Sequence, residues 1–255
     1  LGYYLTLNEW AGPMKNKLVR QAVQYAVDKN AVVQILGGPR ITVPASQFVL
    51  PGNVGYIENY NPYPNKNGNG DPAKAKALLK KAGYANGLAV KLIYQTTDPS
   101  PRIAQAIQAS LKPAGFNVKL VPATQSDFYG KYMLNPDTGK RGVWDIGTPG
   151  WIPDWFGNNG RSVLQPLFTA PGPGASDFGN YNSPVTNKLI DKALTAPSLA
   201  AASKYWQQAG KQIMADSAGV PINVQKWTVF HSSRVQGCVF WWWGLNCDMT
   251  NVWLS

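Results

Sequence analysis

Along this chain, segments with the apolar spacing of helices alternate with segments that have the apolar spacing of strands. Apolar residues recur every three or four positions from Met14 to Leu36, which predicts a helix that Gly37-Gly38-Pro39 ends. The same spacing predicts further helices over residues 71–83, 101–114, 126–134 (with Ser126 as its cap), 183–195 and 198–216. Alternating positions predict strands over residues 3–7, 88–94, 116–121, 144–150 and 220–224. Strands that alternate with helices favour an α/β lobe built on a mixed sheet.

Two stretches follow neither period. Residues 40–70 are rich in Pro, Gly, Asn and Tyr, and a loop of this length is usually functional or packs on a surface. Residues 227–254 are aromatic and strand-like. No flexible linker is long enough to separate two independent domains, and 255 residues correspond to roughly one or two domains. No apolar run reaches the roughly 18 residues of a membrane-spanning helix.

The formal net charge is +11, from 24 Lys and Arg residues against 13 Asp and Glu. Such a balance brings nucleic acid, anionic lipid and acidic partners into consideration. The basic residues are scattered, and the closest pairs are Lys80-Lys81 and Lys140-Arg141. Because nucleic-acid-binding proteins usually show a basic stripe or a recognisable module, we expect no nucleic acid among the partners. The net charge alone keeps that class as an alternative, which a steep fall of binding with salt would support.

The two cysteines, Cys238 and Cys247, stand nine positions apart. Two Cys and one His cannot supply four soft ligands to zinc, so we predict no metal site. A catalytic cysteine would need a basic setting and a His partner, whereas the neighbours here are aromatic. We favour a disulfide that closes a short hairpin loop over two buried free thiols. A disulfide would indicate an oxidising, extracytoplasmic compartment.

Enzyme signatures are mostly absent from the sequence. The single histidine, His231, lies near Ser232 and Ser233, and neither serine stands in a G-x-S-x-G elbow. The Gly-rich stretch at residues 67–70 is not part of a phosphate-binding loop after a strand. We therefore predict a protein that is not an enzyme, with no catalytic residues and no cofactor.

Aromatic residues form the most conspicuous cluster, over residues 150–159. Asp154 stands there between Trp151 and Trp155, just beyond a predicted strand, where open α/β sheets bind ligands. A carboxylate in an aromatic setting is weakly screened and attracts a cation, which the Trp faces could also contact. The candidate ligand-binding residues are Gly150, Trp151, Asp154, Trp155, Asn158 and Asn159. The alternative is structural, with Asp154 capping the next turn and the tryptophans in the core.

Four segments, in order, resemble the extracellular solute-binding proteins of family 5, the receptors of oligopeptide and dipeptide ABC importers. Residues 16–29 (NKLVRQAVQYAVDK) are similar to the family's "VRQAL-x-x-AID-R/K" helix, and residues 71–84 (DPAKAKALLKKAGY) to its "D-P-x-KAKALLAEAGY" helix. Residues 111–118 resemble the "L-x-x-(A/I)-GI-x-V" join of helix and strand. Residues 145–154 resemble the strand and "GW-x-x-D" turn of the ligand cleft.

The resemblance implies a periplasmic-binding-protein-like (class II) α/β lobe with a mixed sheet flanked by helices and a strand-rich C-terminal tail. It implies a hinge-crossing strand at residues 1–12, a ligand-binding lobe at 13–221 and a tail at 222–255 that returns toward the hinge and first lobe. Family members are about twice this length, so we expect a C-terminal half whose first lobe is absent. The chain opens in a strand with no initiator Met, signal peptide or lipid-anchoring Cys, which agrees with that expectation. The resemblance places the protein outside the cytoplasm, lipid-anchored or periplasmic.

In peptide-binding members of the family, the acid of the "GW-x-x-D" turn pairs with the peptide's terminal amine, and the matching residue is Asp154. The turn then departs from the family's "D-x-x-D/E-P", because Gly157-Asn158 stand where the second acid and the proline belong. The implied ligand is a peptide or another small solute, such as a sugar or a metal chelate, and the implied partners are ABC permease subunits and the first lobe. Two further alternatives are a carbohydrate-active protein, with Asp154, Asn158 and Asn159 binding hydroxyls, and a ligand-sensing domain that transports nothing.

Overall fold

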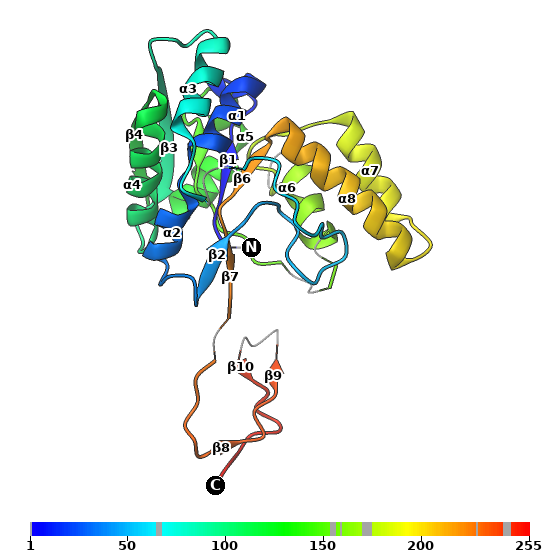
Figure 1. Ribbon diagram of the computed structural model, residues 1–255. Coiled ribbons are helices and arrows are strands. Elements are labelled where there is room, and N and C mark those ends of the chain that lie inside the picture. The colour runs from blue at the N-terminus through cyan, green and yellow to red at the C-terminus, as the bar shows by residue number, and fades with distance from the viewer. Residues whose placement is uncertain are drawn as a thin grey trace.

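A five-stranded mixed sheet forms the centre of the lobe, in the order β4-β3-β5-β1-β6 (Figure 1). Its strands are β1 (Tyr4–Leu7), β3 (Leu88–Gln95), β4 (Phe116–Ala123), β5 (Ile146–Gly147) and β6 (Gly219–Pro221). β3 runs parallel to β4 and β5, whereas β1 runs antiparallel to β5 and β6. The computed structural model describes residues 2–64, 68–153, 157–158, 160–169, 175–227, 229–241 and 246–255. The mixed sheet expected from the sequence is confirmed.

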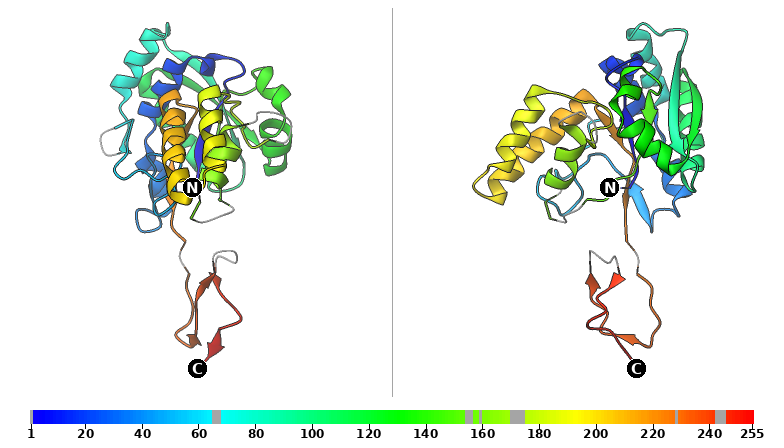
Figure 2. Two further views of the ribbon diagram at one scale, coloured as in Figure 1. Left: turned by 90° about the vertical axis from the view of Figure 1, so that its right-hand side faces the viewer. Right: turned by 180° about the vertical axis from the view of Figure 1, so that it is seen from behind.

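Helices lie in two groups around this sheet (Figures 1 and 2). The first group comprises α1 (Lys17–Ala26), α2 (Lys29–Ile35), α3 (Pro72–Lys81) and α4 (Ser100–Leu111), of which α4 packs on β3 and β4. The second is an antiparallel hairpin of α7 (Pro184–Leu194) and α8 (Leu199–Asp216), which projects sideways from the lobe. Shorter turns are η1 (Pro13–Lys15), η3 (Lys112–Ala114), η4 (Asp127–Met133), α5 (Pro136–Lys140), η5 (Gly160–Leu164) and α6 (Gln165–Phe168).

The single helix predicted over residues 14–36 is wrong, because the chain forms two helices with a break between them. Val27 is extended, with a ψ of 123°, which ends α1. The Asp28 side chain then accepts a hydrogen bond from the backbone N–H of Ala31 at 2.9 Å and so caps α2. An Asp inside an apolar period is thus a start signal, since its short side chain satisfies an N–H of the first turn.

Three other local predictions need correction. Ser126 does not cap the helix after it; the hydroxyl of Thr124 accepts from the Asp127 N–H at 3.1 Å, and the segment folds as the π-helical turn η4. The strand expected over residues 144–150 shrinks to β5 and a single bridge between Tyr3 and Gly150. The strand expected over 220–224 is divided, since β6 stays in the main sheet and β7 (Asn223–Gln225) pairs with β2 (Thr42–Pro44).

Arg20 of α1 joins the start of the chain and the end of α8. The guanidinium of Arg20 lies 3.0 Å from the Glu9 carboxylate and also donates to the backbone carbonyls of Met14 and Asp216. Burial raises the pKa of Glu9 to about 7 and outweighs the lowering effect of Arg20. Arg20 therefore connects α1 to the end of α8 through main-chain contacts that do not depend on the charge of Glu9.

The buried carboxyl of Asp177 gives the lobe a distinct dependence of stability on pH. Burial raises the pKa of Asp177 well above 3.8, and the backbone N–H of Tyr181, which the side chain accepts at 3.2 Å, lowers it less. The native state therefore retains a proton that the unfolded chain releases, so the free energy of unfolding falls as pH rises above about 4. Between the pKa of the unfolded chain and that of the native state, each such carboxyl lowers the free energy of unfolding by about 1.4 kcal/mol per pH unit.

Replacing Asp177 by Asn should make this dependence shallower without removing it, because an amide carries no titrating proton while Glu9, whose pKa is also raised, still contributes. The amide still offers an oxygen to the Tyr181 N–H. Thermal unfolding between about pH 5 and 8 measures the slope directly. Asp191→Asn, at an exposed position of α7, is the matched control and should keep the wild-type slope. An unchanged slope in Asp177→Asn would show that Asp177 is already ionised in the native state.

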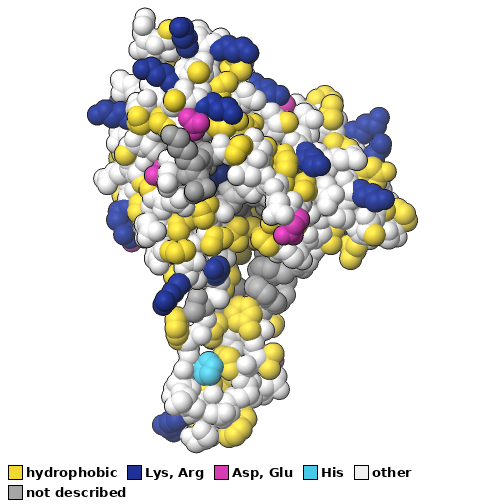
Figure 3. Space-filling model, in the orientation of Figure 1, with side chains coloured by type: hydrophobic (Ala, Val, Ile, Leu, Met, Phe, Trp, Pro, Cys, Tyr) yellow, Lys and Arg dark blue, Asp and Glu magenta, His cyan; other side chains and the backbone are white. Residues whose placement is uncertain are grey.

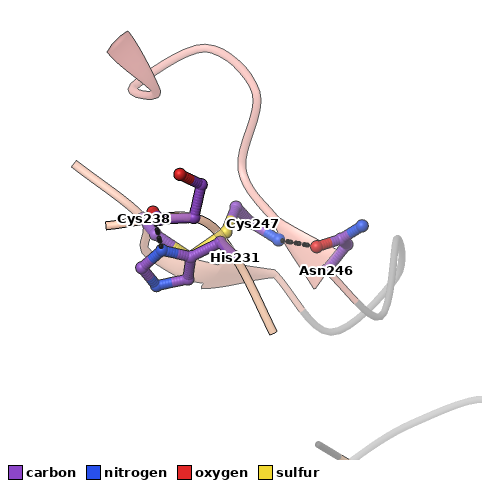
Figure 4. Close-up of a disulfide and its surroundings, with 5 residues drawn as sticks. His231, Cys238, Asn246 and Cys247 are labelled. Carbon is purple, nitrogen blue, oxygen red and sulfur yellow. Dashed lines mark hydrogen bonds between the residues drawn. A yellow bond between two sulfur atoms is a disulfide. The ribbon is translucent and has the colours of Figure 1, made fainter. Parts of the chain in front are cut away.

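The C-terminal tail extends away from the lobe below β7 (Figure 1). It forms two small ladders, β8 (Val235–Gln236) with β11 (Trp253–Leu254) and β9 (Phe240–Trp241) with β10 (Asn246–Cys247). Cys238 and Cys247 are joined in a disulfide beside the β9–β10 ladder (Figure 4), which confirms the disulfide prediction over the free-thiol alternative. Several apolar side chains of the tail are exposed: Phe230, Val239, Trp241, Met249, Trp253 and Leu254.

Candidate functional site

A cleft of about 910 Å³ opens where the start of the chain, β7 and two loops meet. It is lined by residues 2–3, 50–53, 150–153, 157 and 224–227, together with Val43, Gln95 and Tyr129. Parts of the chain that are far apart in the sequence thus share one cavity, whose size is typical of small-molecule sites. Gly150 and Trp151, both predicted as ligand-binding residues, lie in its wall.

The main chain beside β1 holds Gly150 and Trp151 in place. The backbone N–H of Tyr4 donates to the Pro149 carbonyl at 3.1 Å, and the Trp151 N–H donates to the Gly2 carbonyl at 3.0 Å. The indole N–H of Trp151 donates to the Ser162 carbonyl at 2.7 Å. Because its polar atom is used in this way, the half-buried indole presents an apolar face to its surroundings.

The irregular stretch over residues 40–70 supplies a second wall. The side-chain oxygen of Asn53 accepts from the backbone N–H of Gly157 at 2.6 Å, and the Val54 N–H donates to the Gly157 carbonyl at 2.9 Å. These two bonds clamp the end of the aromatic segment to this loop. The sequence predicted that this long loop either carries function or packs on a surface. In the structure the loop holds the segment around Gly157 in position.

Three of the predicted site residues, Asp154, Trp155 and Asn159, lie outside the described residues. Pro153 and Gly157, the described residues on either side of Asp154-Trp155-Phe156, both line the cleft. Asn158 is described but does not line the cleft; its carbonyl accepts from the N–H of Ser162 at 3.4 Å. Its side-chain oxygen is buried and has no hydrogen-bond partner among the described residues. Ligand contact by these four residues therefore stays a prediction.

Sequence reasoning missed much of the polar lining, which comprises Asn53, Gln95, Tyr129, Gln225 and Lys226. Burial raises the pKa of the Tyr129 phenol, and the Gly150 backbone and Gln95 side chain lower it less. The phenol therefore stays neutral at physiological pH and can donate a hydrogen bond.

Lys226 is the one charged residue among the described residues of the wall, and its ammonium donates to the Pro39 carbonyl at 3.1 Å. In the described part of the chain, no three His, Cys, Asp or Glu residues gather as a metal site. His231, the one histidine, is in the exposed tail, where its Nδ1 lies 3.1 Å from the Ser232 carbonyl (Figure 4). The wall thus offers apolar surface, amides, a phenol and one ammonium group.

Comparison with known proteins shows the family of this chain. The family described as "Bacterial extracellular solute-binding proteins, family 5 Middle" matches residues 1–175. The chain belongs to family 5. Within that family it resembles the glutathione-binding protein GsiB of Escherichia coli K12, with 26% identity over 243 residues, 93% of this chain and 44% of the relative. GsiB of Pectobacterium atrosepticum is 27% identical over 239 residues, 92% of this chain and 44% of the relative. The chain spans about half the length of the curated relatives it matches.

Solved structures of the same fold confirm the periplasmic-binding-protein-like lobe. HbpA2 from Haemophilus parasuis superposes with a TM-score of 0.80 and 25% identity, over 100% of this chain and 48% of that chain. DppA from Helicobacter pylori, solved in complex with the peptide STSA, superposes with a TM-score of 0.76 and 24% identity. The match covers 99% of this chain and 47% of DppA. Family 5 relatives are binding proteins by name. In the described part of this chain, no helix combines the length and apolar character needed to cross a membrane.

Proposed function

We propose that this chain is the ligand-binding lobe of the receptor component of an ABC importer that captures peptides or peptide-like solutes outside the membrane. The observation that carries the proposal is the cleft lined by residues 150–153 and 157, in the segment whose sequence resembles the family's "GW-x-x-D" turn. The glutathione-binding relatives support a small peptide-like ligand. The disulfide in the tail supports an extracytoplasmic location.

In this proposal Asp154 pairs with the ligand's amine, while Trp151 and Trp155 form apolar walls on either side of it. Main-chain groups of the cleft wall, those of Gly150 among them, contact the ligand's backbone in the manner of strand addition. Asn158 and Asn159 are further candidates for ligand contact. A first lobe, joined through a hinge at residues 1–12, closes over the lobe at residues 13–221 and buries the solute. The tail at residues 222–255 packs against that first lobe, and the closed receptor docks on permease subunits.

A non-peptide solute is the second candidate, because Gly157-Asn158 replaces the second acid and proline of the turn. Amides without a second carboxylate suit hydroxyls and neutral polar groups as well as peptide bonds. In that case the cleft and the closing motion stay the same, and only the amine-binding role of Asp154 changes.

The ligand can be identified from the whole receptor, by which we mean this chain joined to its proposed first lobe. The whole receptor would be purified from its native host, denatured, and the released small molecules analysed by mass spectrometry. Recovered peptides or glutathione-like thiols are the expected result. Recovered sugars or metal chelates would contradict the peptide proposal and the amine role of Asp154.

A further inference from the structure

Positive charge is concentrated in one part of the chain. Residues 72–123 contain seven Lys and one Arg but only one acid, so they account for +7 of the net +11. The acid, Asp98, forms an ion pair with Arg102 at 2.8 Å, one turn along α4, and so neutralises none of the lysines. Figure 3 shows Lys and Arg side chains gathered over the end of the molecule that carries α3.

Two of these lysines line a polar groove of about 490 Å³ at the start of β3 and β4, and three more stand within a few residues of its lining in the sequence. Lys76 and Lys112 line the groove, Lys80 and Lys81 end α3 just before its rim at Tyr84, and Lys119 follows two residues after Asn117 of its wall. All five are exposed, and no acidic residue lines the groove. We call these five residues the lysine face. The other two lysines are engaged elsewhere, Lys74 over the Tyr25 ring and Lys91 on the Gly142 carbonyl.

The lysine face and the ligand cleft lie at opposite ends of one strand. β3 begins with Leu88 in the groove, and its last residue, Gln95, lines the cleft. Eight residues of strand at about 3.3 Å each separate the two by roughly 25 Å. A partner bound to the lysine face would therefore leave the cleft free to take up solute.

We propose that the lysine face binds an anionic phospholipid surface. Lysine ammonium groups are flexible point charges, which suit a fluid array of headgroups better than the fixed geometry of one phosphate. No large hydrophobic residue is exposed between residues 72 and 123, so the contact rests on charge alone and inserts nothing into the bilayer. Such attraction acts within a Debye length and is reversible, which would keep the protein near a membrane without fixing it there.

Vesicle co-sedimentation tests this proposal with the 255-residue chain and needs no solute. We expect binding to vesicles of equal parts phosphatidylglycerol and phosphatidylcholine at about 0.1 M salt, none to phosphatidylcholine alone, and loss at about 0.5 M salt. The variant K76E/K80E/K81E/K112E should bind at least about tenfold more weakly. The matched control, K188E/K192E/K204E/K211E, changes the same number of exposed lysines on the α7–α8 hairpin and should lose less than about threefold.

Equal losses in the two variants would overturn the proposal, because net charge rather than the lysine face would then govern binding. Equal binding to both kinds of vesicle would also overturn it. If the chain binds a soluble acidic peptide more tightly than the anionic vesicles at the same salt concentration, the lysine face would be assigned to a protein partner instead. If the glutamate variant unfolds by circular dichroism, the corresponding K76Q/K80Q/K81Q/K112Q variant replaces it, with a glutamine control on the hairpin.

Discussion

Replacing Asp154 by Asn in the whole receptor should weaken the binding of peptides with a free amino terminus by about 2–5 kcal/mol, or from tens to thousands of fold. The cause is the loss of a charge pair in a closed cleft, where the ligand's amine would be buried without its counter-charge. Among the described residues of the wall no other carboxylate is available to replace Asp154. Isothermal titration of the receptor with the recovered peptide measures the effect.

The control for this prediction changes the ligand as well as the protein. An N-acetylated peptide has no amine to pair, so the wild type and Asp154→Asn should bind it with similar, weak affinity. Asp191→Asn, on the exposed surface of α7, should bind both peptides as the wild type does. Equal affinity of the wild type for free and acetylated peptides would refute the amine-binding role.

Replacing Trp206 by Ala should lower the free energy of unfolding by about 3–5 kcal/mol. Trp206 lies in α8 and is only 1% exposed, and two loops pack directly on it. A Cβ on Gly55 would come within 2.6 Å of the Trp206 side chain, and one on Gly160 within 2.2 Å of its ring. Gly55 follows the cleft residue Asn53 and Gly160 follows the aromatic segment, so the same change should loosen both walls.

Chemical denaturation measures the loss of stability, and two variants serve as controls. Trp253→Ala, at a 59% exposed position of the tail, should leave the stability of this chain nearly unchanged. Trp206→Phe should cost less than Trp206→Ala, because the indole N–H has no hydrogen-bond partner among the described residues and a ring still fills part of the space. A loss below about 1 kcal/mol for Trp206→Ala would mean that the loops do not depend on this side chain.

The regular elements could be predicted because their signals are local. The Asp71 side chain accepts a hydrogen bond from the Lys74 N–H at 3.0 Å, and Pro72 follows as the first residue of α3. The Ser198 hydroxyl accepts a hydrogen bond from the Ala201 N–H at 3.2 Å. Those caps and an apolar period suffice to locate α3 and α8. The pairing of β2 with β7 could not be predicted, because it joins three-residue strands that are about 180 positions apart and have no period of their own.

The residues of the candidate site also differ in whether a local signal in the sequence marks them. Gly150 and Trp151 could be found because the aromatic cluster and the family's turn mark them in one continuous segment. Asn53, Gln95 and Tyr129 could not, since each comes from a different part of the chain and only the folded sheet brings them together. A Pro-Gly-Asn sequence in a long loop, at residues 51–53, is the one local signal that could have indicated Asn53.

Hydrogen–deuterium exchange of the whole receptor, as purified with its solute and after the solute has been removed by unfolding and refolding, tests the cleft most directly. The account predicts that the solute slows exchange in peptides covering residues 150–158 and 50–54, and leaves residues 84–89 of the distant groove unchanged. Protection confined to other parts of this lobe, with residues 150–158 unaffected, would contradict the assignment of the ligand site.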